Sequence, residues 1–254
     1  MADSAEKRRV LVTGGGSGLG AAIVHALAEA GHDVAYTYRS SPEPDARLAH
    51  LAATHPHQDF AAHQLDLADK KAVEQFAAGI DAHGPYFAFV HNAGQSYDSL
   101  AMMMDQTKAE QAMQVNFWSF TQLVNALVRP MMRARDGRLA VIGSVTALRA
   151  NQGNAAYAAS KAALLAYVRT LAVETARTGI TVNYLAPGFI DTAMVAPYAK
   201  YREQMESQIP ARRFARPEEI ANVVCFLLSA QASYVTGSVI TVDGGLSAAL
   251  GIHR

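Results

Sequence analysis

The sequence predicts an α/β fold built on one doubly wound parallel sheet of about seven strands, with helices on both faces. Three observations lead to this prediction. Short β-type runs alternate with stretches of helical composition almost throughout the chain, and no repeat or linker interrupts the alternation. The chain has 254 residues, of which 50% are hydrophobic, so it can bury a large core. Because α/β domains of this size are commonly single, we expect one domain over residues 1–254.

The first predicted strand, residues 10–12, runs into a glycine-rich loop at residues 13–20 and a helix at residues 21–30. This order is typical of a dinucleotide site, because small residues let the backbone approach a pyrophosphate and the helix N-terminus offers free N–H groups. Leu19 stands where the strict G-x-G-x-x-G spacing needs its third glycine, and the loop instead reads T-G-x-x-x-G-x-G. A glycine-rich turn that binds no ligand is the alternative interpretation.

The second predicted strand, residues 33–38, is followed by Arg39 and Ser40. An NAD site places a carboxylate near this position to bind the ribose 2′-hydroxyl, and this sequence has none there. An arginine and a hydroxyl can instead pair with a 2′-phosphate through charge-assisted hydrogen bonds. The sequence therefore favours NADP over NAD, unless Arg39 is only a solvated loop residue.

The next elements place further polar residues at strand ends. We expect a short helix at residues 45–53 with Asp45 as a possible cap, a strand at 60–65 ending at Asp66, a helix at 72–82 and a strand at 87–90 leading to Asn92. Ligands of open parallel sheets bind outside the carboxyl ends of the strands, so these side chains should line a ligand site. His55, His57 and His63 do not suggest a metal, because Pro56 breaks helical pairing and no carboxylate or thiolate completes a ligand set.

The second half of the sequence continues the alternation. Thr107 and Glu110 form a capping-box pattern that should open a long helix through about Arg133, in which Asn116 could be an exposed polar residue. Five more elements follow: a strand at 139–142 ending at Ser144, a helix ending at Gly179, a strand at 180–185, a helix from Pro217 and a strand at 239–242. Residues 189–210 are apolar but broken by prolines, which predicts a lid over the substrate.

The helix that ends at Gly179 contains Tyr157-Ala158-Ala159-Ser160-Lys161. The four-residue spacing puts the Tyr157 phenol and the Lys161 ammonium on one face of the helix, where the cation can favour the phenolate. Such a tyrosine can exchange protons nearer to neutral pH than a free phenol does. Judged from this spacing alone, the alternative is a purely structural pair, in which the Tyr157 ring is packed and the Lys161 charge is solvated.

Composition limits the partners. Lys plus Arg and Asp plus Glu are 22 each, which argues against a global attraction to nucleic acid or to an anionic membrane. The single cysteine, Cys225, excludes an internal disulfide and fits a reducing compartment, so we expect a cytoplasmic protein. No stretch approaches the length of uninterrupted apolar sequence that a membrane span needs.

Taken together, these motifs resemble the short-chain dehydrogenase/reductase family in order and spacing over nearly the whole chain. They are Thr13-Gly14-x-x-x-Gly18-x-Gly20, Asn92-Ala93-Gly94, Asn116, Ser144, Tyr157-x-x-x-Lys161 and Pro187-Gly188. The resemblance implies a Rossmann-type fold and a catalytic tetrad of Asn116, Ser144, Tyr157 and Lys161. His91 departs from the family, which often has a second Asn there. The predicted cofactor-binding set is Gly14, Ser17, Gly18, Leu19, Gly20, Arg39, Ser40, Asp66, Leu67, Asn92, Ala93, Gly94, Tyr157, Lys161, Pro187, Gly188, Ile190 and Thr192.

Within this family the stretches around residues 142–145, 188–194, 209–213 and 217–221 are most similar to 3-oxoacyl-[acyl-carrier-protein] reductases. This implies reduction of a 3-oxoacyl thioester by NADPH, in fatty acid or polyene/polyketide biosynthesis, with an acyl carrier protein as partner. It also implies a homotetramer in which Trp118 and Phe120 are available for burial. The residues implied to meet substrate or partner are Ser144, Phe189, Met194, Arg135 and Arg177, with the arginines near the pocket mouth. The alternatives are a reductase of another small ketone, sugar or steroid, and a silent NADP-binding sensor.

In the implied reaction, Tyr157 protonates the developing alkoxide while Ser144 holds the carbonyl oxygen. Lys161 lowers the pKa of Tyr157 and binds the nicotinamide ribose. The backbone of Asn116 binds a water that reloads Lys161 from solvent.

Overall fold

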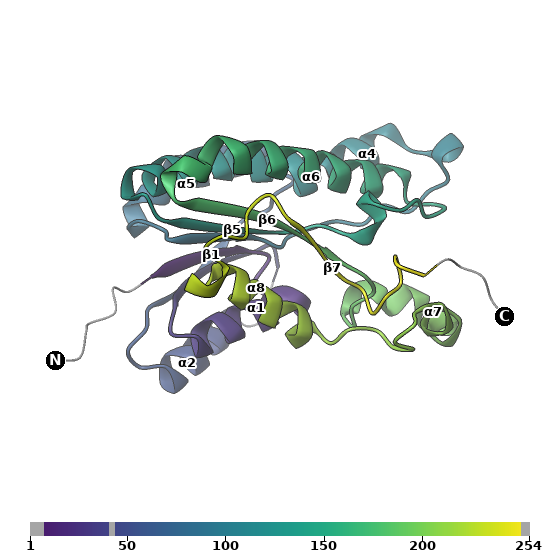
Figure 1. Cartoon of the computed structure of the whole chain (residues 1–254), viewed down its shortest axis with the longest axis horizontal. Helices are drawn as coiled ribbons and strands as arrows, with labels where there is room; N and C mark the ends of the chain where they lie inside the picture. Colours follow the sequence, from purple (N-terminus) through teal and green to yellow (C-terminus); the bar gives the residue numbers. More distant parts are fainter. Residues whose placement is uncertain (1–7, 41–43, 250–254) are drawn as a thin grey trace.

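The computed structural model describes residues 8–40 and 44–249, and this part of the chain contains one parallel sheet of seven strands in the order β3-β2-β1-β4-β5-β6-β7 (Figure 1). The predicted fold class is confirmed. The strand order reverses between β1 and β4, which is the point where open α/β sheets bind ligands. The strands are β1 (Arg9–Thr13), β2 (Asp33–Tyr38), β3 (Phe60–Gln64), β4 (Ala88–His91), β5 (Gly137–Ile142), β6 (Ile180–Pro187) and β7 (Val239–Val242).

Helices cover both faces of the sheet (Figure 1). Helices α1 (Gly18–Glu29), α2 (Pro44–Thr54) and α8 (Pro217–Leu228) pack on one face, and α3 (Lys70–Ala78), α5 (Ser119–Ala134) and α6 (Ala155–Thr175) pack on the other. The central strands read as continuous apolar runs because both of their faces are buried. Successive residues of β1 alternate between the two cores, with Leu11 in one and Val10 and Val12 in the other.

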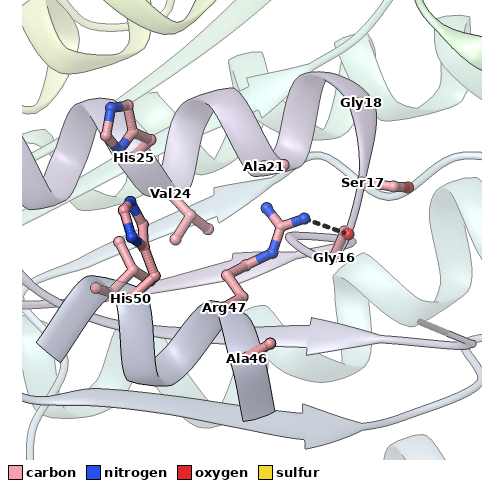
Figure 2. Close-up of a pocket in the computed structure, with 10 residues that line it drawn as sticks. Gly16, Ser17, Gly18, Ala21, Val24, His25, Ala46, Arg47 and His50 are labelled. Atoms are coloured by element: carbon pink, nitrogen blue, oxygen red, sulfur yellow. Dashed lines mark hydrogen bonds between the residues drawn. The ribbon is translucent and has the colours of Figure 1, made fainter. Parts of the chain in front are cut away.

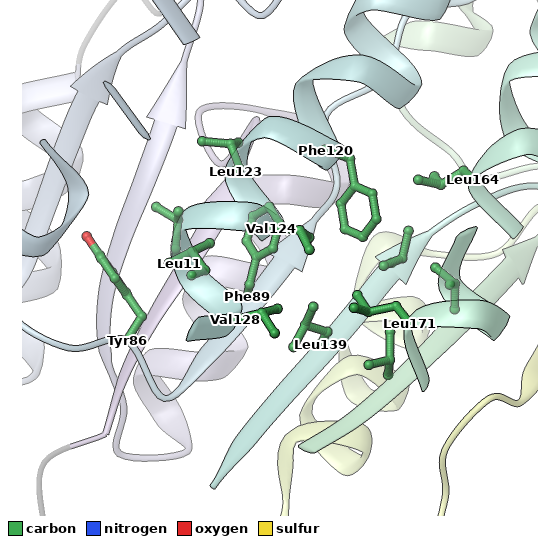
Figure 3. Close-up of a cluster of buried hydrophobic side chains, with 14 of the residues drawn as sticks. Leu11, Tyr86, Phe89, Phe120, Leu123, Val124, Val128, Leu139, Leu164 and Leu171 are labelled. Atoms are coloured by element: carbon green, nitrogen blue, oxygen red, sulfur yellow. The ribbon is translucent and has the colours of Figure 1, made fainter. Parts of the chain in front are cut away.

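The core under α5 and α6 is built around aromatic and leucine side chains (Figure 3). Phe89 from β4 stacks on Phe120 from α5 with ring centroids 5.9 Å apart. Phe120 is completely buried, so it is not available for an interface between subunits, and that part of the prediction is wrong. Trp118 is 51% exposed and remains available. The two neighbouring aromatics differ because they point to opposite sides of the helix.

The long helix has a different start and interior from those predicted. Helix α4 (Gln106–Met113) is capped by Asp105, whose carboxylate accepts a hydrogen bond from the backbone N–H of Lys108 at 3.1 Å. The predicted capping box is wrong, because Thr107 already lies inside the first turn. A π-helix, Gln114–Trp118, then separates α4 from α5. The helix ends at Ala134, close to the predicted end, with Arg135 in the left-handed conformation.

Smaller differences concern helix ends. Asp45 lies in the first turn of α2 rather than at its cap. Helix α3 begins after the capping residue Asp69 and is followed by the 3₁₀-helix Ile80–His83, so the predicted helix at 72–82 is two short elements. Helix α6 and the 3₁₀-helix Ala176–Thr178 end at Gly179, whose φ of 78° is the left-handed conformation that glycine favours.

The predicted lid contains the 3₁₀-helix Ala193–Tyr201 and α7 (Arg202–Gln208). Three further 3₁₀-helices, Ala101–Met103, Val145–Ala147 and Ala230–Ala232, lie in connections. Over the described residues, the helices are too short or too polar for any of them to cross a membrane.

Candidate active site

The structure brings the four predicted catalytic residues together at the carboxyl ends of β4 and β5. Ser144 follows β5, Tyr157 and Lys161 lie in the first turns of α6, and Asn116 lies in the π-helix. The Lys161 ammonium donates a hydrogen bond to the carbonyl of Ile142, the last residue of β5, at 2.9 Å. Gly94 lies against both side chains, since a Cβ there would be 3.3 Å from Lys161 Nζ and 3.5 Å from Asn116 Oδ1.

Asn116 is completely buried, so its interpretation as an exposed polar residue is wrong. Its Oδ1 accepts a hydrogen bond from the backbone N–H of Gln95 at 2.7 Å, and its Nδ2 donates to the Gln95 carbonyl at 3.0 Å. Nδ2 also donates to Ser160 Oγ at 2.8 Å, and Ser160 in turn donates to the Tyr157 carbonyl at 2.7 Å. Asn116 therefore ties the loop after β4 to the helix that carries Tyr157.

Ser144 is held in an orientation in which its hydroxyl hydrogen points away from Thr146. Its oxygen accepts hydrogen bonds from the backbone N–H and the hydroxyl of Thr146, at 3.1 Å and 2.9 Å. A serine oxygen has two lone pairs, so both are used and the hydrogen points elsewhere. This hydrogen is donated to the Tyr157 hydroxyl, and the hydrogen bond lowers the pKa of Tyr157. A carbonyl oxygen entering between the two hydroxyls could take the Ser144 hydrogen in place of the Tyr157 oxygen and accept the Tyr157 hydrogen as well.

The electrostatics of Tyr157 and Lys161 differ from the prediction. Burial raises the pKa of Tyr157, and the hydrogen bond with Ser144 opposes this only in part. Burial also lowers the pKa of Lys161 to about 8. The expected lowering of the Tyr157 pKa by Lys161 is not found, because both charged forms lose hydration and Lys161 Nζ, 5.7 Å from the centre of the Tyr157 ring, bonds to Ile142 instead.

His91 was noticed in the sequence only as a departure from the family, and the structure shows that it links β1 to Asn116. Thr13 Oγ1 accepts hydrogen bonds from the backbone N–H groups of Asn92 and Ala93, so its hydrogen donates to His91 Nδ1 at 3.2 Å. The ring hydrogen is therefore on Nε2, which donates to the Asn116 carbonyl at 3.2 Å. Burial, with a smaller contribution from Lys161, lowers the pKa of His91 to about 3. The imidazole is neutral at physiological pH.

Tyr184 on β6 is a second residue that the sequence did not single out. Its hydroxyl donates to the Lys161 carbonyl at 3.2 Å and accepts from the Ser144 N–H at 3.0 Å. Gly143 makes this possible, since a Cβ there would lie 1.7 Å from Tyr184 Cζ. Gly143 in the sequence indicates that another group lies close to the backbone before Ser144, but nothing in the sequence identifies that group as Tyr184.

The glycine loop has a physical reason for each glycine of T-G-x-x-x-G-x-G. Gly14 and Gly18 have φ values of 69° and 50°, which disfavour other residues. A Cβ on Gly20 would lie 2.0 Å from the Gly14 carbonyl oxygen. Asn92 holds the loop from β4, because its Nδ2 donates to the carbonyls of Thr13 and Gly14 at 3.0 Å and 3.2 Å.

The other predicted cofactor residues gather along the same edge of the sheet. Arg39 and Ser40 are exposed after β2, and no side chain in the described part of the structure forms an ion pair with Arg39. Pro187 ends β6, and Thr192 lies 3.5 Å from where a Cβ of Gly18 would be. The remaining members lie beside these elements: Ser17, Leu19, Asp66, Leu67, Ala93, Gly188 and Ile190. A close-approach loop and polar strand ends fit a nicotinamide dinucleotide.

An ion pair within the predicted lid joins its first residues to α7. Arg202 donates to both carboxylate oxygens of Asp191, at 2.9 Å and 2.8 Å, and its guanidinium lies 4.7 Å from the centre of the Phe214 ring. Phe189 is half-buried and stacks on Phe214, and Met194 is 54% exposed.

Arg135 and Arg177 come just before β5 and β6, so they lie at the amino ends of these strands, opposite the edge that carries the tetrad. Arg135 Nη2 donates to the Arg177 carbonyl at 3.1 Å, and the neighbouring Arg138 is buried. The expectation that these arginines lie near the pocket mouth of the same chain is wrong. The reason is that α5 and α6 run antiparallel to the strands, so helix C-termini and strand carboxyl ends are at different edges.

Comparisons with known proteins agree with this geometry. The family model described as enoyl-(acyl carrier protein) reductase matches residues 14–247. The 3-oxoacyl-[acyl-carrier-protein] reductase MabA of Mycobacterium tuberculosis is 38% identical over 241 residues, covering 94% of this chain and 92% of the relative. The corresponding FabG of Escherichia coli is 37% identical over 243 residues, covering 95% and 98%.

Solved structures give the same result. Levodione reductase has a TM-score of 0.89 and 32% identity, covering 95% of this chain and 98% of its own. A protein of Beutenbergia cavernae described as an NAD(P)-dependent gluconate 5-dehydrogenase, solved with bound NADP, has a TM-score of 0.91 and 33% identity, with 97% and 99% covered.

The fold and site define an oxidoreductase that acts on CH–OH or C=O groups with a nicotinamide cofactor. The chain belongs to the short-chain dehydrogenase/reductase family.

Proposed function

We propose that the protein reduces the 3-oxo group of an acyl thioester with NADPH, and that the thioester is carried by an acyl carrier protein. The observation that carries the proposal is the pair of hydroxyls of Ser144 and Tyr157, joined to each other beside the buried ammonium of Lys161. The names of the relatives at 36–38% identity support the acyl substrate. A pathway of fatty acid or polyene/polyketide synthesis and a cytoplasmic location belong to the same proposal.

The chemistry of the site follows from its hydroxyls. When bound, NADPH supplies the hydride that reduces the carbonyl carbon. Ser144 donates a hydrogen bond to the carbonyl oxygen, which stabilises the negative charge that develops there. Tyr157 transfers its proton to the same oxygen, and Lys161 is the proposed source of the proton that restores the phenol. Asn116 holds the loop after β4 against α6, so Lys161 and Tyr157 keep their relative positions.

The family model and the relatives are named for different reactions, the reduction of C=C and of C=O. Two hydroxyl donors converging on one oxygen favour C=O, because a carbonyl oxygen needs a hydrogen-bond donor and then a proton. Reduction of another small ketone, sugar or steroid is the second candidate, and it is favoured by the similarity to levodione reductase. A silent NADP-binding sensor is the third, and the intact tetrad argues against it.

The test compares Tyr157→Phe with the wild-type enzyme on acetoacetyl-coenzyme A. Loss of the proton donor should lower kcat by roughly 100-fold or more, while the Kd for NADPH stays within a few-fold. Lys161→Ala should damage both quantities. Consumption of NADPH is followed by its absorbance, and its binding by fluorescence. If Tyr157→Phe kept most of its kcat, Tyr157 would not be the acid. If the wild type turned over small ketones and no thioester, the second candidate would replace the first, and no turnover of any ketone would favour the sensor.

A further inference from the structure

A cavity of about 640 Å³ lies between α1 and α2 and opens beside the glycine loop (Figure 2). Its walls include Gly16, Ser17 and Gly18 of the loop on one side and Arg47 of α2 on the other. Figure 2 shows the Arg47 side chain reaching from α2 toward the loop. None of the motifs in the sequence singled out this residue.

Arg47 binds the glycine loop with only part of its donor set. Nη2 donates to the Gly16 carbonyl at 3.1 Å. No carboxylate in the described part of the structure forms an ion pair with Arg47, although Asp45 and Arg47 both act on the charge of the Tyr36 phenol. A guanidinium carries five N–H donors in a planar fork, so most of them are available for a second acceptor.

The position of Arg47 connects it with the end of β2. Gly15 N donates to the Thr37 carbonyl at 2.9 Å, and Gly14 N donates to Thr37 Oγ1 at 3.3 Å. A Cβ on Gly15 would lie 2.5 Å from Tyr36 Cβ, so the loop sits directly on β2. Arg39 follows the same strand. Arg47 therefore contacts the glycine loop from α2, and Arg39 follows the strand on which this loop lies. Neither arginine forms an ion pair with an acidic residue in the described part of the chain.

We propose that Arg47 is a second determinant of cofactor specificity, which binds the ribose 2′-phosphate of NADPH together with Arg39. This inference rests on the proposed function, because it needs an NADP site. In this fold the group on the ribose 2′ position is recognised just beyond the second strand, beside the glycine loop. A phosphate there takes two charge-assisted partners, one from the connection after β2 and one from α2.

The experiment measures the binding of adenosine 2′,5′-bisphosphate and of 5′-AMP to the full chain by calorimetry. These two probes differ only in the 2′-phosphate, and no turnover is needed. Arg47→Met should weaken binding of the bisphosphate by about tenfold or more and change binding of 5′-AMP by less than about twofold. Arg47→Lys, which keeps the charge, should recover part of the loss. Arg133→Met, at the far edge of the sheet, is the control for loss of a surface arginine.

Each result decides between roles. Equal losses for both nucleotides would mean that Arg47 only holds the loop, and no loss for either would mean that it is a bystander; both outcomes overturn the inference. If Arg39→Met weakens binding of the bisphosphate, and the variant with both Arg39→Met and Arg47→Met weakens it further, the result would support two phosphate contacts. If the wild type bound both nucleotides equally well, the NADP part of the proposed function would fail, which is a different outcome from an Arg47 that has no effect. Melting temperatures show that each variant is folded.

Discussion

Three residues form a continuous hydrogen-bonded path from the cofactor loop to the catalytic helix. Thr13 at the end of β1 fixes the tautomer of His91, and His91 donates to the carbonyl of Asn116. The Asn116 side chain then reaches Ser160, next to Lys161. Every member of this path is completely buried, so each polar atom depends on its neighbour for a hydrogen bond. A substitution at Thr13 should therefore alter the hydrogen bonds at Asn116 and Ser160.

The burial of His91 predicts how stability depends on pH. Its folded-state pKa of about 3 is below the unfolded value of 6.5, so the unfolded chain binds the proton first as pH falls. The contribution of neutral His91 to the free energy of unfolding is complete above pH ~6.5. It is lost as the pH falls toward 3, by at most about 1.4 kcal/mol per pH unit. His91→Asn should be less stable than wild type at pH 7.5, but its stability should fall less between pH 6.5 and 5. Urea unfolding at each pH measures this, and identical slopes would contradict a buried neutral His91.

At the residue level, the sequence predicted which residues of the proposed tetrad lie together better than it predicted their surroundings. Tyr157 and Lys161 are four residues apart on one helix, and that spacing alone fixes their proximity. The roles of His91 and Tyr184 depend on which strands are neighbours, which a single sequence does not state. The direction of the Tyr157 pKa was predicted wrongly, because burial acts on both Tyr157 and Lys161 and disfavours both charged forms.

At the level of elements, Arg202 forms two ion pairs inside the predicted lid, one with Asp191 and one with Glu206. Arg202 opens α7, and its two hydrogen bonds to Asp191 join α7 to the first residues of the lid. If residues 189–210 close over the substrate, Arg202→Met should raise KM by roughly three- to tenfold with little change in melting temperature. Arg213→Met is the matched control, since Arg213 makes a similar two-pronged pair with Glu219 at the start of α8. Equal KM effects in both variants would mean that the pair does not serve the lid.

The element that sequence reasoning missed is the π-helix at Gln114–Trp118. Its residues have no composition that distinguishes them from an α-helix, and the extra residue in the turn is stabilised by tertiary contacts such as the bond from His91 to Asn116. Strands and most helices were predicted because alternating apolar runs carry their own signal. Helix starts were less reliable, because Asp105 and Thr107 are both acceptable caps and only the three-dimensional path of the chain selects one.

At the scale of the whole molecule, the two edges of the sheet have different properties. The carboxyl edge carries the tetrad, and the amino edge carries Arg135 and Arg177. A carrier protein that docked on these arginines would be separated from the site of the same chain by the length of α6. Docking is compatible with catalysis only if another subunit places its site beside them. The predicted homotetramer would have to supply this arrangement, so the carrier prediction and the oligomer prediction depend on each other.

Charge reversal at the amino edge tests both the carrier prediction and the oligomer prediction. Arg177→Glu keeps the backbone carbonyl that Arg135 binds, so it changes the charge without removing that hydrogen bond, whereas Arg135→Glu loses both. If the arginines dock an acidic carrier, each variant should raise KM for the carrier-bound substrate by roughly three- to tenfold, more at low salt than at high salt.

The coenzyme A thioester is the control, because it has no carrier surface to dock and its KM should stay nearly unchanged. Equal effects on both substrates in Arg135→Glu alone would mean that this residue supports the fold through the Arg177 carbonyl. Unchanged KM values in both variants would remove the arginines from docking. An active monomer in light scattering would leave them too far from the site to act.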